Sequence, residues 1–198
     1  MMNIVYLIPL MAYLLGSIPF GYLLVRFNEG KDIRSFGSGN IGATNVFRKS
    51  RATGILTLIL DAGKGYLAVV IAGWLGGNQE WQGVAAVCAI IGHVFTIWLL
   101  FKGGKGVATG CGTFLALSPL AVLTTLIIFV IVFLITRYIS AASIAATAFF
   151  PFWAFIYGEP GSILLWAIAG SLLIIAKHHQ NIRRLISGTE KKLVLGSR

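Results

Sequence analysis

Three segments of the chain combine glycine with basic, hydroxyl and amide side chains, a composition suited to binding phosphate groups. The first, residues 34–48, reads RSFGSGNIGATNVFR. Glycines in such a loop let backbone N–H groups converge on an anion, and the polar side chains add hydrogen-bond donors. The spacing also matches G-x-G-x-x-G, but no strand precedes it, which argues against a dinucleotide-binding fold. A polar re-entrant turn is the alternative. The residues expected to contact substrate are Gly37, Ser38, Gly39, Asn40, Gly42, Thr44, Asn45 and Arg48.

The second segment, residues 101–109, reads FKGGKGVAT and joins two apolar stretches. It places a glycine turn and two lysines at the start of the next expected helix, where unpaired N–H groups and the helix dipole favour an anion. It is not a Walker A loop, because the first glycine of that motif is missing. A basic turn that only orients the chain in a membrane is the alternative, but it does not explain three glycines. The residues expected to bind substrate are Lys102, Gly103, Gly104, Lys105, Gly106 and Thr109.

The third segment, residues 177–190, follows the last apolar stretch. Helical spacing places His178, Asn181 and Leu185 on one face. The sequence leaves open whether His178 and Asn181 are catalytic or structural. We interpret the nearby basic cluster as a lipid-facing stop signal rather than a catalytic set. Its members are Arg183, Arg184, Lys191 and Lys192.

Ionisable residues also lie inside apolar stretches. Asp61 and Lys64 are i, i+3 neighbours, which predicts an internal ion pair of structural or catalytic importance. His93 precedes Phe101 by eight residues, about 12 Å along a straight helix, and we expect a packed, hydrogen-bonded core histidine. The two cysteines of the chain lie in apolar runs with no metal-ligand spacing. We therefore expect no metal site and no cofactor.

The composition indicates what must position these residues. Of the 198 residues, 57% are hydrophobic and only 11% are charged, whereas soluble domains are about 25% charged. The formal net charge is +10, but no hydrated basic domain carries it, which argues against nucleic-acid binding. Anionic membrane lipids and phosphorylated substrates are the expected partners. The first apolar stretch lacks a basic leader and a cleavage site, so we interpret it as a retained span.

Seven apolar stretches predict the membrane topology. Six approach the roughly 20 residues that a spanning helix needs: 4–26, 53–75, 81–101, 119–136, 141–157 and 161–177. Residues 107–117 form a shorter seventh stretch that ends before Pro119. If all seven cross, every one of the 16 Lys and Arg residues except Lys64 falls on one side. The positive-inside rule then places the N-terminus outside and the C-terminus in the cytoplasm. Fusing 107–136 into one helix would give six spans and break this asymmetry.

We therefore expect an all-α integral membrane protein with seven transmembrane helices, one of them short, and glycine-rich cytoplasmic loops. Residues 1–198 form a single domain, and we expect a monomer. The closing Gly196-Ser197-Arg198 is consistent with a tag remnant.

The three segments, in this order, resemble the signature motifs of the acyl-phosphate:glycerol-3-phosphate acyltransferase family, known as PlsY. The matching stretches are 37–48, 92–109 and 178–190, and residues 16–21 (GSIPFG) also fit. The resemblance covers nearly the whole chain. One departure is His179-Gln180, where many members carry Arg-Glu.

The resemblance implies an enzyme that moves a fatty acyl group from acyl phosphate to the 1-hydroxyl of glycerol 3-phosphate, giving lysophosphatidic acid and phosphate. This is the first acylation step of bacterial phospholipid synthesis, and the family uses neither acyl-CoA nor acyl-carrier protein. It also implies a multi-pass protein of the bacterial inner membrane with a cytoplasmic active site. The important family residues fall on Ser38, Arg48, Lys105, His178 and Asn181, and the substrate-affinity glycines on Gly103, Gly104 and Gly106; Glu190 closes the third motif as structural support.

The absence of one motif from this sequence agrees with the implied use of acyl phosphate as donor. Acyltransferases with soluble donors resemble one another in an H-x-x-x-x-D box, but here Trp98, Arg183 and Arg184 stand five residues after the histidines. No Ser-His-Asp arrangement is evident, so we expect direct attack by the glycerol hydroxyl, with its proton going to a substrate phosphate or to His178.

We expect Arg48, Lys105 and the loop amides to bind the two phosphates. Ser38 and Asn181 would orient the glycerol or polarise the acyl carbonyl. The acyl chain would lie between spans, open to lipid. The main alternative is a membrane transporter for a phosphorylated metabolite, for which Asp61 and Lys64 are the supporting residues.

Overall fold

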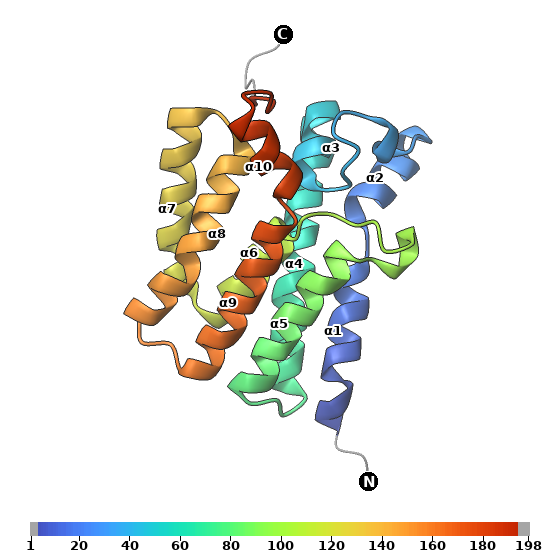
Figure 1. Ribbon diagram of the computed structural model, residues 1–198. Helices are drawn as coiled ribbons and strands as arrows, with labels where there is room; N and C mark the ends of the chain where they lie inside the picture. The colour runs from blue at the N-terminus through green and yellow to red at the C-terminus, as the bar shows by residue number, and fades with distance from the viewer. Residues whose placement is uncertain (1–3, 194–198) are drawn as a thin grey trace.

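The computed structural model describes residues 4–193, and all of its regular structure is helical. Residues 1–3 and 194–198, and with them the expected tag remnant, lie outside the described residues. The α-helices are α1 (Ile8–Ser17), α2 (Phe20–Glu29), α3 (Ala43–Lys49), α4 (Arg51–Trp74), α5 (Gln79–Val94), α6 (Val107–Leu117), α7 (Pro119–Thr136), α8 (Ile139–Ile156), α9 (Gly161–Ala176) and α10 (His179–Ile186) (Figure 1). Short 3-10 helices are η1 (Ile4–Leu7), η2 (Ile33–Ser35) and η3 (Ile97–Leu99).

Every apolar stretch predicted from the sequence contains a helix. The bounds of α6 and α7 coincide with the predicted 107–117 and 119–136, and Pro119 takes the first position of α7, where its missing N–H costs nothing. Five stretches are long and apolar enough to cross a membrane, and α9 with α10, bent by 56°, gives a sixth if the pair is one span. With only 11 residues, α6 is shorter. The count of seven crossings therefore stays a prediction.

The first apolar stretch is not one straight helix. It breaks between α1 and α2 at Ile18 and Pro19, because proline disfavours helical geometry at the residue before it. The break leaves the Ile18 carbonyl outside the helical ladder, where it becomes available to another partner.

The bundle has a tightly packed centre and a looser side. In Figure 1, α1 lies along α5 on one side, α7 and α8 form a pair on the other, and α4, α6 and α9 lie between them. Glycine allows the closest approach: a Cβ added at Gly65 or Gly112 would collide with the backbone of Thr109 or Ala62, so α4 and α6 touch along their backbones. In contrast, α7 packs mainly against α8. This arrangement leaves room for a pocket between α4, α6 and the α7–α8 pair.

Two short α-helices lie outside the predicted apolar stretches, although the third motif segment was expected to be helical. The short helices α3 and α10 lie at the end of the bundle where the described chain finishes, and the first described residues lie at the opposite end (Figure 1). Both belong to motif segments, the first and the third, and they bring residues of those segments to the mouth of the pocket.

Candidate active site

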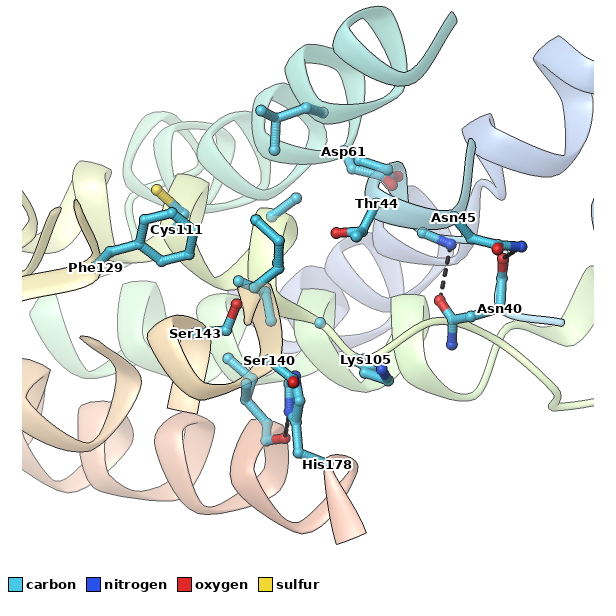
Figure 2. A pocket seen from close by; sticks show the side chains of 18 of the residues that line it. Asn40, Thr44, Asn45, Asp61, Lys105, Cys111, Phe129, Ser140, Ser143 and His178 are labelled. Carbon is cyan, nitrogen blue, oxygen red and sulfur yellow. Dashed lines mark hydrogen bonds between the residues drawn. The ribbon is translucent and has the colours of Figure 1, made fainter. Parts of the chain in front are cut away.

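A pocket of about 770 Å³ joins the three motif segments. Its polar end is formed by the loop before α3, the start of α6, and α8 and α10, and its apolar end by α4, α6, α7 and α8. Figure 2 shows Lys105, Ser140, Ser143 and His178 around the pocket, with Cys111 and Phe129 toward the apolar end. The sequence-predicted residues that line it are Gly37, Ser38, Asn40, Gly42, Thr44, Asn45, Arg48, Asp61, His93, Lys105, Gly106, His178, Asn181 and Glu190.

Asn45 holds the first motif loop in place. Its buried amide nitrogen donates to the carbonyls of Phe36 and Asn40, both at 2.9 Å, and its oxygen accepts the Ser38 N–H at 2.9 Å. Gly37, whose φ is +62°, contacts the same oxygen so closely that a Cβ would collide with it. Since both ends of the Asn45 amide are bonded within the loop, this side chain shapes the site more than it offers free bonds to a substrate.

Four further polar side chains of this segment line the pocket. Asn40 accepts the Gly42 N–H at 2.8 Å, which orders the entry into α3 (Figure 2). Ser38 is exposed at the mouth, and Thr44 lies one turn further in. Arg48 reaches across the mouth, where its Nη2 donates to the Lys191 carbonyl at 3.3 Å.

The second motif loop lies closer to His93 than the sequence indicated. A straight helix from His93 to Phe101, on which the expected spacing of about 12 Å depended, does not form, because α5 ends at Val94. Leu100 and Phe101 both adopt left-handed backbone conformations. The N–H of Gly104 then donates to the His93 carbonyl at 3.0 Å.

Lys105 is the basic residue of this loop that faces the pocket (Figure 2). Burial lowers the pKa of Lys105 to about 8; Glu190 opposes this change, whereas Arg184 and Arg48 add to it. Gly106 also lines the pocket, whereas the other predicted binding residues of the loop do not. Lys102 is exposed, Thr109 is buried in the α4–α6 contact, and Gly103 and Gly104 pack against the end of α5. Gly39 of the first loop is exposed and does not line the pocket either.

The third motif closes the pocket through a carboxylate. Glu190 Oε1 accepts hydrogen bonds from Asn181 Nδ2 at 2.8 Å and Ser140 Oγ at 2.9 Å, and Oε2 accepts from Arg184 Nε at 2.6 Å. Burial alone would raise the pKa of Glu190, but these three bonds and the charge of Arg184 lower it below its usual value. We call Ser140, Asn181, Arg184 and Glu190 the rim cluster.

His178 and Asn181 present defined atoms to the pocket. His178 Nδ1 lies 2.7 Å from the Ile174 carbonyl, which can only accept, so Nδ1 carries a hydrogen and Nε2 has the lone pair when the ring is neutral. Within residues 4–193, the buried Asn181 Oδ1 has no hydrogen-bond partner. Both residues therefore retain an acceptor for a substrate.

Four lining residues were missed or misread in the sequence. Arg184 and Lys191 line the pocket, so the interpretation of their cluster as a lipid-facing stop signal is wrong for these two. Arg184 is three residues after Asn181 and shares its face, a signal that the spacing already contained. Ser140 and Ser143 repeat that spacing on α8, and a polar pair on one face of an apolar helix is the mark that could have found them.

The predicted ion pair of Asp61 and Lys64 is confirmed and extends to His93. Lys64 Nζ lies 2.7 Å from Asp61 Oδ1, 2.6 Å from the Ile18 carbonyl at the α1–α2 break, and 3.0 Å from His93 Nδ1. All three side chains are less than 5% exposed. His93 is a buried, hydrogen-bonded histidine, as predicted, but it also lines the pocket. We call Asp61, Lys64 and His93 the interior cluster.

The apolar end of the pocket has a closed floor and an open side. Phe114 and Phe150 stack with ring centroids 4.0 Å apart and nearly parallel planes. On the flank between α4 and α7, the lining residues Ile55, Leu58 and Leu126 are exposed. The apolar part of the pocket therefore opens sideways, toward the surroundings of the bundle.

Comparison with known proteins gives a consistent result. A family model described as "Glycerol-3-phosphate acyltransferase" matches residues 6–188. A glycerol-3-phosphate acyltransferase of Trichlorobacter lovleyi is 51% identical over 185 residues, which cover 91% of this chain and 93% of that protein. One of Ehrlichia chaffeensis is 44% identical over 98% of this chain and 100% of its own length.

Two solved structures share the fold. Both are crystal structures of PlsY (YgiH), described as an integral membrane glycerol 3-phosphate acyltransferase. The glycerol 3-phosphate form is 38% identical, with a TM-score of 0.91, and 96% of each chain is covered. The lysophosphatidic acid form is 36% identical, with a TM-score of 0.88 and coverage of 96% of this chain and 95% of that one.

Proposed function

The chain belongs to the glycerol-3-phosphate acyltransferase family, and on that premise we propose that it takes its acyl group from acyl phosphate. The acyl group moves to the 1-hydroxyl of glycerol 3-phosphate, giving lysophosphatidic acid and inorganic phosphate. The reaction is the first acylation of bacterial phospholipid synthesis.

One observation carries the proposal: a single pocket joins a basic, polar end to an apolar end that opens sideways. A donor with a phosphate head and a fatty chain has this same division. Its chain would lie along the apolar walls above the Phe114–Phe150 stack, and its phosphate would lie near Lys105. Burying the chain supplies affinity of about 0.8 kcal/mol for each methylene removed from water.

The cations at the polar end suit two phosphates. Arg48, Lys105 and Arg184 all line the pocket, and the charges of Arg48, Arg184 and Glu190 each affect the pKa of Lys105, which supports a shared electrostatic environment. Arginine can hold a phosphate through two parallel bonds, whereas lysine acts as a point charge. We assign Arg48 and Lys105, with the loop amides around Gly106, to the phosphates of the two substrates.

The acceptors at the polar end suit a hydroxyl nucleophile. Asn181 Nδ2 donates to Glu190, and the unpaired Oδ1 can accept from a glycerol hydroxyl, although an acceptor atom cannot polarise a carbonyl. Ser38 remains the side chain for orienting the glycerol or polarising the carbonyl at the mouth. The nucleophile's proton goes to a substrate phosphate oxygen or to His178 Nε2.

We propose direct attack without an acyl-enzyme. In the described part of the chain, no serine or cysteine is hydrogen-bonded to a histidine, so no hydroxyl or thiol is paired with a histidine base. Acyl phosphate is a mixed anhydride with a good leaving group, so positioning and charge neutralisation can supply much of the rate. The assigned phosphate ligands provide both.

The proposed setting is the bacterial inner membrane, crossed seven times with α6 as the short span, and with the pocket's polar end in the cytoplasm. Lys and Arg gather at that end, as the positive-inside rule requires of a cytoplasmic face. The first and last described residues lie at opposite ends of the bundle, which suits an odd number of crossings (Figure 1). We also propose that the protein acts as a monomer.

Family membership favours acyl transfer over the transport of a phosphorylated metabolite. The residues that supported transport, Asp61 and Lys64, form an ion pair, and Lys64 also donates to the Ile18 carbonyl and to His93 Nδ1 inside the bundle. Lys64 is thus buried and already paired, which does not suit the binding of a transported anion.

Purified protein in a lipid phase, given acyl phosphate and glycerol 3-phosphate, should release phosphate and form lysophosphatidic acid. Acyl-CoA in place of acyl phosphate is the control and should give no product. Rapid-quench labelling with a radioactive acyl donor should leave the protein unlabelled. Turnover with acyl-CoA alone would refute the donor assignment, and a stoichiometric acyl-protein would refute direct attack.

A further inference from the structure

Lys64 fixes which ring nitrogen of His93 carries a hydrogen. An ammonium has three donors and no acceptor, and the three short contacts of Lys64 Nζ are Asp61 Oδ1, the Ile18 carbonyl and His93 Nδ1. His93 Nδ1 must therefore accept. The opposite tautomer would need Nδ1 to donate to Asp61 Oδ1, but that distance is 3.6 Å, too long for a hydrogen bond. In the neutral ring the hydrogen is on Nε2.

The Nε2–H group points to the second motif loop. A Cβ added at Gly104 would collide with His93 Nε2, so this nitrogen lies directly against the glycine that precedes Lys105. His93 lines the pocket although only 4% of its surface is exposed. Over residues 4–193, its Nδ1 and its backbone carbonyl are both bonded, whereas Nε2 has no hydrogen-bond partner.

We propose that His93 is a further substrate-binding residue, whose Nε2–H donates to a phosphate oxygen held by the loop around Lys105. This deepens the proposed function, on which it rests. The interior cluster acts through His93: Lys64 sets the tautomer, Asp61 balances the charge of Lys64, and His93 delivers a neutral donor to the pocket.

The neighbours of Nε2 favour a phosphate oxygen as its acceptor. Gly104 leads into Lys105 and then into the start of α6, where the N–H groups of the first turn have no helical partner. An anion bound there would pair with the Lys105 ammonium and accept hydrogen bonds from backbone N–H groups of α6 and from His93 Nε2–H. Because Asp61 and Lys64 neutralise each other, the interior cluster adds a directed hydrogen bond and no net charge to the pocket.

Nitrogen-15 NMR of the ring tests the tautomer without turnover. The chain has only three histidines, so comparing the spectra of wild type and His93→Asn identifies the His93 signals. We expect a bare Nδ1, a hydrogen-bearing Nε2, and a shift of the Nε2 signal when inorganic phosphate is added. In the charge-neutral pair Asp61→Asn/Lys64→Met, the two tautomers should become mixed. A bare Nε2 in the wild type, or an Nε2 signal unmoved by saturating phosphate, would overturn the proposal.

Two matched variants test the donor. His93→Asn keeps an acceptor near the Nδ1 position but has no donor at the Nε2 position, whereas His93→Gln can place an amide N–H there. The inhibition constant of inorganic phosphate should rise about tenfold in His93→Asn, and much less in His93→Gln, because a hydrogen bond to an anion is lost only in the first. The Michaelis constant for glycerol 3-phosphate or the one for acyl phosphate should rise together with this inhibition constant. The substrate whose Michaelis constant rises is the one whose phosphate His93 binds.

Equal phosphate inhibition in wild type and both variants, with all three folded by thermal melting, would also overturn the proposal. If wild-type protein failed to transfer acyl groups, the proposed function would fall. The NMR response of His93 to inorganic phosphate would still report on this site separately.

Discussion

The interior cluster and the rim cluster face the same pocket but are built in opposite ways. In the interior cluster a cation is central: Lys64 pairs with Asp61 of α4 and donates hydrogen bonds to the Ile18 carbonyl at the α1–α2 break and to His93 Nδ1 of α5. In the rim cluster an anion is central: Glu190 accepts from three donors, which come from α8 and α10. Each cluster leaves one polar atom for the pocket, a donor on His93 and an acceptor on Asn181.

The difference lies in what holds each centre. Lys64 and Asp61 are nearly inaccessible to solvent and belong to helices packed on several sides. Glu190 belongs to a segment beyond α10, and the side chain of its partner Arg184 is 38% exposed. We infer that the interior cluster is a rigid part of the helix bundle that forms when the protein folds. The rim cluster instead fixes the last described segment at the mouth of the pocket.

The largest expected effect comes from breaking the ion pair of the interior cluster. Asp61→Asn leaves the Lys64 ammonium buried without its counter-charge, and we expect a loss of about 3–5 kcal/mol in the free energy of unfolding. Thermal melting in detergent would measure it. Asp61→Asn/Lys64→Met is the control, since removing both charges should restore most of the stability. Wild-type melting of Asp61→Asn would show that Asp61 is not the group that compensates Lys64.

A smaller effect is expected at the rim. In Glu190→Gln one carboxylate oxygen becomes an amide nitrogen, which cannot accept from Arg184 or Asn181, so we expect a stability loss of about 1–2 kcal/mol. Activity should fall further, because Asn181 is no longer held. Melting and kcat/KM should be compared with those of Glu159→Gln, in the turn between α8 and α9, which should match wild type. If Glu190→Gln lowered the melting temperature as much as Asp61→Asn does, the proposed difference in rigidity between the rim cluster and the interior cluster would be wrong.

The third prediction concerns the charge of Lys105, which should change activity only when the pH rises above neutral. Its pKa of about 8 means that it is mostly cationic at pH 7 and loses its charge as the pH rises through 8. At pH 9 about a tenth of it would remain charged, so kcat/KM for glycerol 3-phosphate should fall about tenfold between pH 7 and pH 9.

Variants of the two clusters show which one sets this pKa. Glu190 raises the pKa of Lys105, so Glu190→Gln should move the alkaline fall to lower pH, whereas Asp61→Asn/Lys64→Met should leave it in place. Lys105→Arg should remove the alkaline fall while lowering the maximum rate. If kcat/KM of Lys105→Arg still decreased at alkaline pH, the decrease would belong to the titration of another group.

The sequence predicted the elements whose signal is local. Apolar runs predicted a helix in all seven stretches, and Pro119 marked the start of α7, because hydrophobicity and proline act within a few residues. The spacing of Asp61 and Lys64 predicted their ion pair for the same reason. Membership of the acyltransferase family also followed from the motifs.

What the sequence did not predict depends on contacts between distant residues. Leu100 and Phe101 are unusual in left-handed conformations, so nothing in the sequence indicated that the chain would fold back to place Gly104 on His93. The helices α3 and α10 are too short and polar for an apolar pattern. Basic residues after a span are typical of any membrane exit, and only the fold shows that Arg184 turns inward to Glu190.

The sideways opening between α4 and α7 determines how the two substrates would meet. Acyl phosphate would diffuse in the plane of the membrane and enter past Ile55, Leu58 and Leu126, while glycerol 3-phosphate would arrive through water at the mouth near Ser38. On the proposed function, neither substrate would block the path of the other, and we expect them to bind in either order. The concentration that governs the donor is then its mole fraction among the lipids, and adding inert lipid should slow the enzyme by surface dilution.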